Sequence, residues 1–327
     1  MLSLVPALLF GIWNTGYQHS VAYGLNWGFW PIVGYGIVKI LPLYLVSYIV
    51  GLAIEFTSAQ LRGHEVNEGY LVSGMIIPLI VPVDVPLWML ALAVAFAVIF
   101  GKEVFGGTGM NIWNPALLAR AFLFFSYPSS MTGDTIWVAT EPILGMGFKA
   151  PDGYTMATPL GEIAQHADVS ASFNDMIIGL IPGSMGETSV IAIAIGAVIL
   201  LWTGIASWKT MLSVFLGGGL MAVVFEQLGM SSIPWYEHIV LGGFCFGAVF
   251  MATDPVTSAR TESGKWVYGA LIGIMAVVVR VMNPGYPEGM MLAILFGNMF
   301  APLIDYCVVD RNISRRSKRG AQKNANQ

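Results

Sequence analysis

Apolar stretches, each about long enough to cross a membrane, follow one another along this chain. A helix that spans a bilayer needs about 20 consecutive, mainly apolar residues. The stretches fall into two groups, the first at residues 2–16, 33–56, 68–82, 86–105 and from 114 onward, the second at 187–204, 209–228, 236–253, 264–282 and 288–307. Only 10% of the residues are charged, compared with about 25% in soluble proteins. The sequence therefore predicts an all-α integral membrane protein with about ten transmembrane helices.

The two groups predict two five-helix bundles with broken or half helices, one at 1–127 and the other at 177–310. A polar segment at 128–176 separates them, and a basic tail follows at 311–327. Basic residues are retained on the cytoplasmic side of a membrane, so the tail is expected in the cytoplasm. The segment at 128–176 has one basic residue and six acidic ones, and we expect it outside.

The stretch at 101–128 interrupts two apolar runs with polar residues and glycines. It contains Lys102-Glu103, a glycine-rich turn, Asn111 and Asn114-Pro115. Irregular backbone at membrane depth is tolerated only where protein buries it or where it lines a cavity. Asn114-Pro115 and Asp254-Pro255 each have the pattern of a capping side chain followed by proline at the first helical position. Either pair is explained by a cap alone, or by a polar ligand held at the helix start.

Three carboxylates lie within or at the ends of apolar runs, at Glu55, Asp254 and Asp305. Ionisable residues inside a membrane are costly to bury and are often functional. Carboxylate oxygens suit sodium as well as protons, and the sequence does not choose between them. Glu55 and Asp305 can also be read as interfacial residues that reach the lipid headgroups.

The polar segment contains Asp152-Gly153-Tyr154-Thr155-Met156-Ala157-Thr158-Pro159-Leu160. The simpler interpretation is that Thr158 caps a short helix opened by Pro159, with Glu162 in its first turn. The alternative is that the Thr158 hydroxyl, outside the membrane, is esterified by a transferase with a flavin phosphate.

Several motifs together resemble the B-subunit family of the sodium-translocating NADH:quinone oxidoreductases. The resemblance runs from near residue 10 to the basic tail. The D subunit of Rnf-type ferredoxin:NAD oxidoreductases shares the flavin-attachment motif and the Asn-Pro helix start, but His64–Gly69 fits the quinone reductase better. The motifs are His64–Gly69, Lys102–Gly109, Asn114–Ala116, Arg120–Phe125, Ile181–Ser184, Met251–Pro255 and Pro287–Ala293.

The resemblance implies a membrane subunit that works with five other subunits in the bacterial inner membrane. In this family FMN is joined through its phosphate to the residue that matches Thr158, in a reaction carried out by a flavin transferase. Riboflavin binds near residues that match Asn111 and Asn114, with Asp254 in a nearby motif. Electrons pass from the FMN of the C subunit to this FMN, then to riboflavin and ubiquinone. Such transfer requires positioning of redox groups rather than acid–base chemistry, so no catalytic residue is expected.

The resemblance also implies that Glu55 and Asp305 take part in sodium uptake. Gly51-Leu52 stands where the family often has Gly-Gly, in the quinone region, and Leu52 adds bulk there. Thr155-Met156 replaces the commoner Ser-Gly before the acceptor threonine. Family members carry an N-terminal extension that this sequence lacks, so we expect a truncated start.

Two other functions remain open at this point. The first is the Rnf-type D subunit, with the same flavin chemistry but different end partners. The second is a cofactor-free solute channel, in which Thr158 is only a cap. Basic residues cluster only in the tail, so the sequence predicts no nucleic-acid partner.

Overall fold

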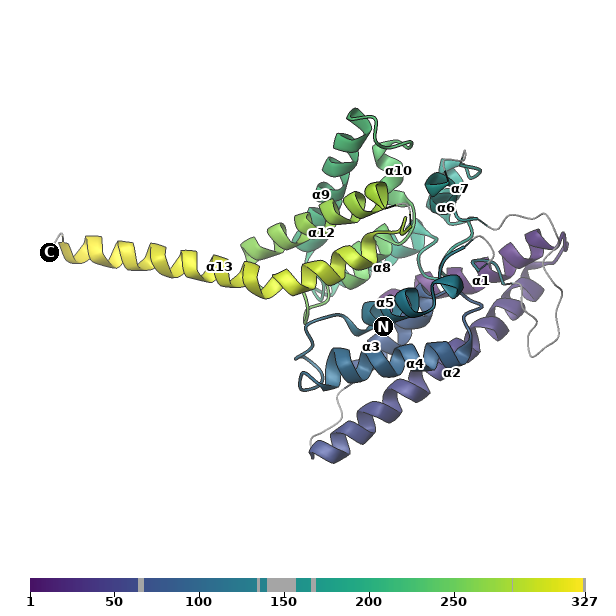
Figure 1. Cartoon of the computed structure of the whole chain (residues 1–327), viewed down its shortest axis with the longest axis horizontal. Coiled ribbons are helices and arrows are strands. Elements are labelled where there is room, and N and C mark those ends of the chain that lie inside the picture. Colours follow the sequence, from purple (N-terminus) through teal and green to yellow (C-terminus); the bar gives the residue numbers. More distant parts are fainter. Residues whose placement is uncertain (64–67, 134–135, 140–156, 166–168, 284, 326–327) are drawn as a thin grey trace.

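A computed structural model describes the chain apart from residues 64–67, 134–135, 140–156, 166–168, 284 and 326–327. Helices, and no strands, make up the regular structure of the described residues (Figure 1). The prediction of an all-helical protein is therefore confirmed. Residues 64–67 hold most of the His64–Gly69 motif, and 140–156 includes Asp152 to Met156, so these parts of the motifs lie outside the described residues.

The first half of the chain begins with a short 3-10 turn and five α-helices. A π-helical turn, η2, continues α4 directly, and a 3-10 turn, η3, follows α5. The elements are η1 (Leu2–Leu4), α1 (Val5–Ala22), α2 (Phe29–Arg62), α3 (Tyr70–Ile80), α4 (Leu87–Val98), η2 (Ile99–Glu103), α5 (Pro115–Ser126) and η3 (Pro128–Ser130).

Two short helices belong to the polar segment and its end, and the remaining helices form the second half. Here too a π-helical turn, η4, continues a helix, α11. The elements are α6 (Pro159–Ala164), α7 (Phe173–Ile178), α8 (Val190–Trp202), α9 (Trp208–Gln227), α10 (Trp235–Val240), α11 (Phe244–Phe246), η4 (Gly247–Met251), α12 (Glu262–Met282) and α13 (Met290–Ala325).

Four of the described helices, α2, α9, α12 and α13, are long and apolar enough to cross a membrane. The helices α3, α5 and α8 are apolar but shorter. Polar breaks shorten several predicted spans, because a glycine-rich turn follows η2 and non-helical residues follow η4. The structure thus shows a membrane-capable helical protein, and the number of about ten spanning helices stays a prediction.

Helices within each half pack closely on one another, and the halves also meet. In the second half α12 packs between α9 and α13, while α2 packs against α1, α3 and α4 in the first. A Cβ added to Gly217 of α9 would lie 2.6 Å from the carbonyl oxygen of Ala270 in α12. Only glycine allows backbones to approach so closely, as in many membrane interfaces. Contacts of α1 with α8 and of α5 with α13 join the halves.

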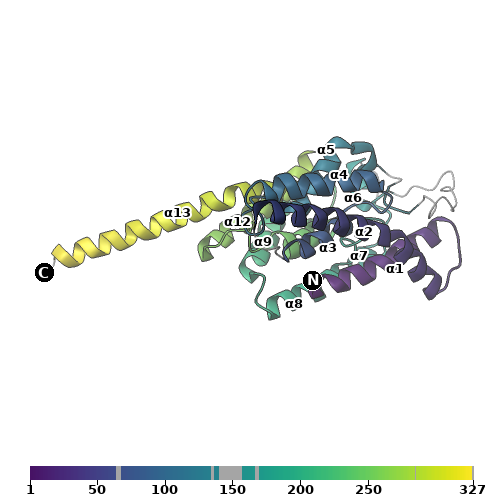
Figure 2. The same ribbon diagram turned by 90° about the horizontal axis from the view of Figure 1, so that it is seen from below.

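The last helix, α13, is much longer than the bundle around it. Its C-terminal part projects away from the other helices in both views (Figures 1 and 2). Residues 311–319 are all exposed and include Arg311, Arg315, Arg316, Lys318 and Arg319. The basic tail expected at 311–327 is therefore a helical continuation of α13 as far as Ala325.

Candidate functional site

Thr158 begins the short helix α6, as its sequence context predicts. Its Oγ1 accepts a hydrogen bond from the backbone N–H of Gly161 at 3.1 Å, and Pro159 occupies the first helical position. Glu162 lies in the first turn, and its carboxylate accepts bonds from the backbone and the hydroxyl of Ser170, at 2.9 and 2.7 Å. The predicted cap is confirmed, and it holds the Thr158 hydroxyl at a defined place.

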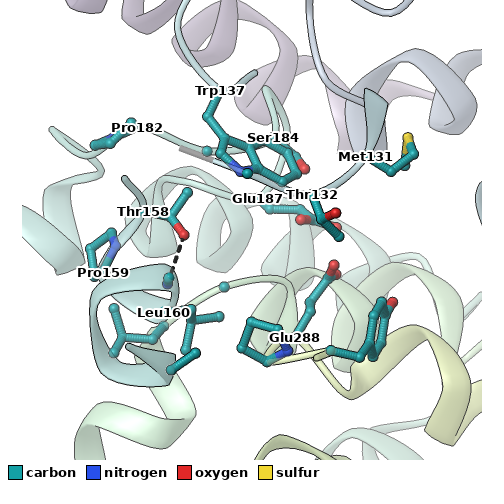
Figure 3. Close-up of a pocket in the computed structure, with 18 of the residues that line it drawn as sticks. Met131, Thr132, Trp137, Thr158, Pro159, Leu160, Pro182, Ser184, Glu187 and Glu288 are labelled. Carbon is teal, nitrogen blue, oxygen red and sulfur yellow. Dashed lines mark hydrogen bonds between the residues drawn. The ribbon is translucent and has the colours of Figure 1, made fainter. Parts of the chain in front are cut away.

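A cavity of about 260 Å³ opens beside Thr158. This volume is just below the range of ~300–1,000 Å³ that is typical of small-molecule pockets. Aromatic side chains line part of it, from Phe124, Trp137 and Tyr286. In the view of Figure 3 the ring of Trp137 lies above the side chains of Thr158 and Glu187. The hydroxyl of Thr158 therefore lies at a pocket with flat apolar surfaces and polar groups.

A cluster of three charged residues, Arg120, Glu187 and Glu288, also lines this cavity. We call it the charge cluster. Nη1 of Arg120 donates to Oε1 of Glu187 at 2.6 Å, and Nη2 donates to Oε2 of Glu288. Arg120 is only 3% exposed, although it carries a full charge. Glu288 points toward Glu187 across the cavity (Figure 3), so charged groups from α5 and from the loops before α8 and α13 meet there.

Asn114 and Asp254 come together at a second place, where the two halves of the chain meet. Oδ1 of Asn114 accepts from the backbone N–H of Ala116 at 3.0 Å, which confirms the predicted cap of α5. Its Nδ2 donates to Oδ2 of Asp254 at 3.4 Å, and the same oxygen accepts from Thr257. Asn111 instead bonds the carbonyl of Trp113 within its own loop. The structure thus joins Asn114 to Asp254 but gives Asn111 a local partner.

Glu55 of α2 forms a buried ion pair with Lys102 of η2. Their side chains are only 5% and 4% exposed, and Oε2 of Glu55 has no hydrogen-bond partner among the described residues. Beside this pair, Glu103 accepts a bond from the hydroxyl of Ser58 at 2.5 Å. The π-helical turn places Lys102 and Glu103 next to each other toward α2. The same turn thus supplies the partner of Glu55, which is Lys102, and the partner of Ser58, which is Glu103.

The sequence model of the NQR2, RnfD, RnfE family matches residues 1–314. The chain belongs to this family. It is 47% identical to the B subunit of the Na(+)-translocating NADH-quinone reductase from Chromohalobacter salexigens, over 98% of this chain and 82% of that protein. It is 45% identical to the protein of the same name from Ectopseudomonas mendocina, over 97% of this chain and 84% of that protein.

Asp305, which the family resemblance associates with sodium, accepts hydrogen bonds from the two residues that precede α12. Its Oδ2 accepts from the backbone N–H of Arg260 at 2.7 Å. Its Oδ1 accepts from the backbone N–H and the hydroxyl of Thr261, at 2.9 and 2.6 Å. Asp305 thereby ties α13 to the start of α12, whereas Glu55 has its partner on η2. The two carboxylates have separate partners, and their role in sodium uptake stays a prediction.

Gly51 and Leu52, the expected quinone region of the family, lie on α2 opposite α3. A Cβ added to Gly51 would overlap Cζ of Tyr70. The Tyr70 ring is fully buried, and its hydroxyl donates to the carbonyl of Ser47 at 2.9 Å. Gly51 is therefore required for this close packing, whereas Leu52 is only partly buried.

This packing predicts that Gly51→Ala destabilises the protein by about 1–3 kcal/mol, because the added methyl group overpacks a full site. The thermal unfolding midpoint of the purified protein in detergent measures the effect. Leu52→Ala is the matched control on the neighbouring position, and we expect a smaller loss. A Gly51→Ala protein as stable as the wild type would show that Tyr70 can move aside.

Sequence reasoning did not identify the charge cluster or Lys102 as parts of sites. Arg120 gave a signal, since it is a lone basic residue within the apolar run that starts at Asn114-Pro115. Its partners could not be named, because they lie 67 and 168 residues further along the chain.

Proposed function

We propose that this chain is the flavin-carrying membrane subunit of a bacterial sodium-pumping NADH:ubiquinone reductase. It passes electrons from covalent FMN at Thr158 through riboflavin to ubiquinone, coupled to sodium export. It works with the other five subunits in the inner membrane and is loaded by a flavin transferase. Its C-terminus is cytoplasmic, and residues 128–176 face outside. The family of the chain supports this proposal, and the cavity beside Thr158 is the observation that carries it.

The residues around the cavity fit a covalently held flavin. Thr158 offers a positioned hydroxyl at one wall, and the rings of Phe124 and Trp137 offer flat surfaces on which a planar ring can lie. Oγ1 of Thr188 and Oη of Tyr286 are buried without a hydrogen-bond partner among the described residues. Both residues line the cavity. Buried polar groups normally have partners, so these hydroxyls suit a polar ligand.

Bound FMN would supply electron transfer in single steps, which is chemistry that no side chain provides. The protein would position the group and exclude water. The cap at Thr158 fixes the attachment point, the aromatic residues cover the ring, and the charge cluster supplies the local field. No side chain needs to exchange a proton in this account.

The flavin content of the purified subunit tests the proposal. Protein co-expressed with the flavin transferase is precipitated with acid, and the flavin in the pellet and in the supernatant is measured. We expect FMN to stay with the denatured chain and riboflavin to be released. A chain that retains no flavin after denaturation would refute the attachment at Thr158.

For riboflavin, we propose a site at Asn111, Asn114 and Asp254, where the halves of the chain meet. Asn114 and Asp254 are in contact, and the preceding turn requires glycine because φ is +117°, +93° and +91° at Gly106, Gly107 and Gly109. Such a turn allows close approach of a ligand to the backbone.

The change Asn114→Ser separates the cap from the amide. Serine caps a helix about as well as asparagine, but it is too short to replace the amide that reaches Asp254. We expect Asn114→Ser to deplete acid-released riboflavin as strongly as Asn114→Leu, while the FMN on the denatured chain is unchanged. Full riboflavin content in both variants would remove Asn114 from the site.

For sodium, the proposal places uptake near Glu55 and Asp305. The unpartnered oxygen of Glu55 supports a cation there, because a buried carboxylate oxygen normally has a partner. Gly51 and Leu52 on the same helix would place ubiquinone near this carboxylate. The Rnf-type alternative would show no reduction of quinone by the assembled complex with NADH.

A further inference from the structure

The charge cluster places more charged groups at the cavity than the attachment of a group to Thr158 requires. An ester at Thr158 needs one hydroxyl and an accessible phosphate. Its lining nevertheless includes a nearly fully buried guanidinium, two carboxylates, and Thr188 and Tyr286, whose buried hydroxyls have no hydrogen-bond partner among the described residues. Burial of charged groups costs several kcal/mol per ion, so their place at this cavity calls for an explanation.

The charges in the cluster do not balance when all groups are ionised. Arg120 faces both Glu187 and Glu288, which gives one positive and two negative charges. Arg280, a second buried guanidinium, donates to the carbonyl oxygens of His238, Leu241 and Glu288. It contributes positive charge nearby but forms no ion pair with a carboxylate of the cluster.

The backbone holds the two glutamates close together. A Cβ added to Gly243 would lie 2.7 Å from Oε1 of Glu288 and 2.8 Å from Oε1 of Glu187. Both carboxylates therefore lie against the same glycine, in space that a side chain at this position would occupy. The two negative groups and Arg120 keep a fixed arrangement beside the cavity.

We infer that the charge cluster is a set of positioning residues that sets the redox potential of the flavin carried at Thr158, with Arg120 favouring the reduced form and the two glutamates opposing it. The inference rests on the proposed function and goes beyond it, because it assigns roles to three residues outside the attachment motif. An added electron places negative charge on the flavin. In a buried site that charge interacts strongly with nearby fixed charges.

The same cluster joins the two halves of the protein. Arg120 comes from α5, and the glutamates precede α8 and α13. Tyr286, two residues before Glu288, lines the same cavity. A change of charge on the flavin would therefore alter its electrostatic interaction with residues that connect the two halves.

Redox titration of the flavin in the assembled complex tests the inference, with the flavin absorbance as the readout. Glu187→Gln removes a negative charge and is expected to raise the midpoint potential of the FMN. Arg120→Gln removes the positive charge and is expected to lower it. The double variant Arg120→Gln/Glu187→Gln has the net charge of the wild type and is expected to lie between the two. A structural defect alone would not move the potential in opposite directions.

Each variant is also run on a denaturing gel, where FMN fluorescence shows that the flavin is attached. Lys209→Gln, which breaks an exposed ion pair with Glu262 on the second half, is the control and should leave the potential unchanged. If Arg120→Gln does not fold, Glu187→Gln and Glu288→Gln decide, since both should raise the potential. Attached FMN with the wild-type potential in both glutamate variants would overturn the inference. A wild-type band without FMN would instead overturn the proposed function.

Discussion

Replacing Thr158 by valine is expected to abolish the covalent attachment of FMN that we propose for this protein. Valine has nearly the shape of threonine but no hydroxyl, so no ester can form at this position. The complex is produced together with the flavin transferase, the subunits are separated on a denaturing gel, and the band is viewed under ultraviolet light. We expect full fluorescence in the wild type and none in Thr158→Val, at equal amounts of stained protein.

Two variants make this result specific. Thr158→Ser keeps both the hydroxyl and the cap of α6, so its band should remain fluorescent. Thr132→Val removes another hydroxyl from the lining of the same cavity, and its fluorescence should also remain. Loss of the cap in Thr158→Val costs about 1 kcal/mol, which is too little to remove the protein. A fluorescent Thr158→Val band would show that the flavin is attached elsewhere.

Replacing Lys102 by methionine is expected to destabilise the protein by about 3–5 kcal/mol. The change leaves the carboxylate of Glu55 buried, without its cation and with one oxygen already unpartnered. The thermal unfolding midpoint of the purified complex in detergent measures the loss. An exposed pair behaves differently, so Lys209→Met, which removes one of the two partners of Glu262, should cost about 1 kcal/mol or less.

The double variant Glu55→Gln/Lys102→Met separates charge from shape. It removes both charges, and most of the lost stability should return, because a neutral pair in a buried place is often as stable as an ion pair. If the double variant is as unstable as Lys102→Met alone, the loss comes from packing around η2 rather than from an unpaired carboxylate.

Local features of this protein could be predicted from its sequence. Asn114 and Thr158 cap helices with proline at the first position, as their dipeptides indicate. A cap depends on residues only two or three positions away, so such predictions need no knowledge of packing. The same prediction is wrong at Asp254-Pro255, where no helix begins and the Asp254 carboxylate instead accepts bonds from Val256 and Thr257 in a turn. The family resemblance was also readable from motifs and is confirmed by the match to residues 1–314.

Contacts between distant parts of the chain could not be predicted in the same way. The sequence marks Glu55 as a costly intramembrane carboxylate, but its partner Lys102 is 47 residues away, and nothing in the pattern pairs the two. The sequence predicts a sodium-binding or interfacial role for Asp305, whereas its bonds to the start of α12 depend on how α13 packs. The packing of the helices determines which distant residues come into contact, and this packing cannot be read from the pattern of a single sequence.

The number of spanning helices shows the same limit. Hydropathy identified about ten apolar stretches, and four described helices are long and apolar enough to cross a membrane by themselves. Stretches such as α3 and α5 are shortened by non-helical residues, and these breaks place the polar groups of η2 and Asn114 inside the protein.

We propose that electron transfer through this chain is coupled to sodium. The most direct measurement is the rate of ubiquinone reduction by the assembled complex with NADH, at rising sodium concentration and constant ionic strength. We predict a rate that increases with sodium and saturates, and that falls to background in the Thr158→Val complex, which would lack the FMN proposed at this position. A wild-type rate that is the same with and without sodium would contradict the account.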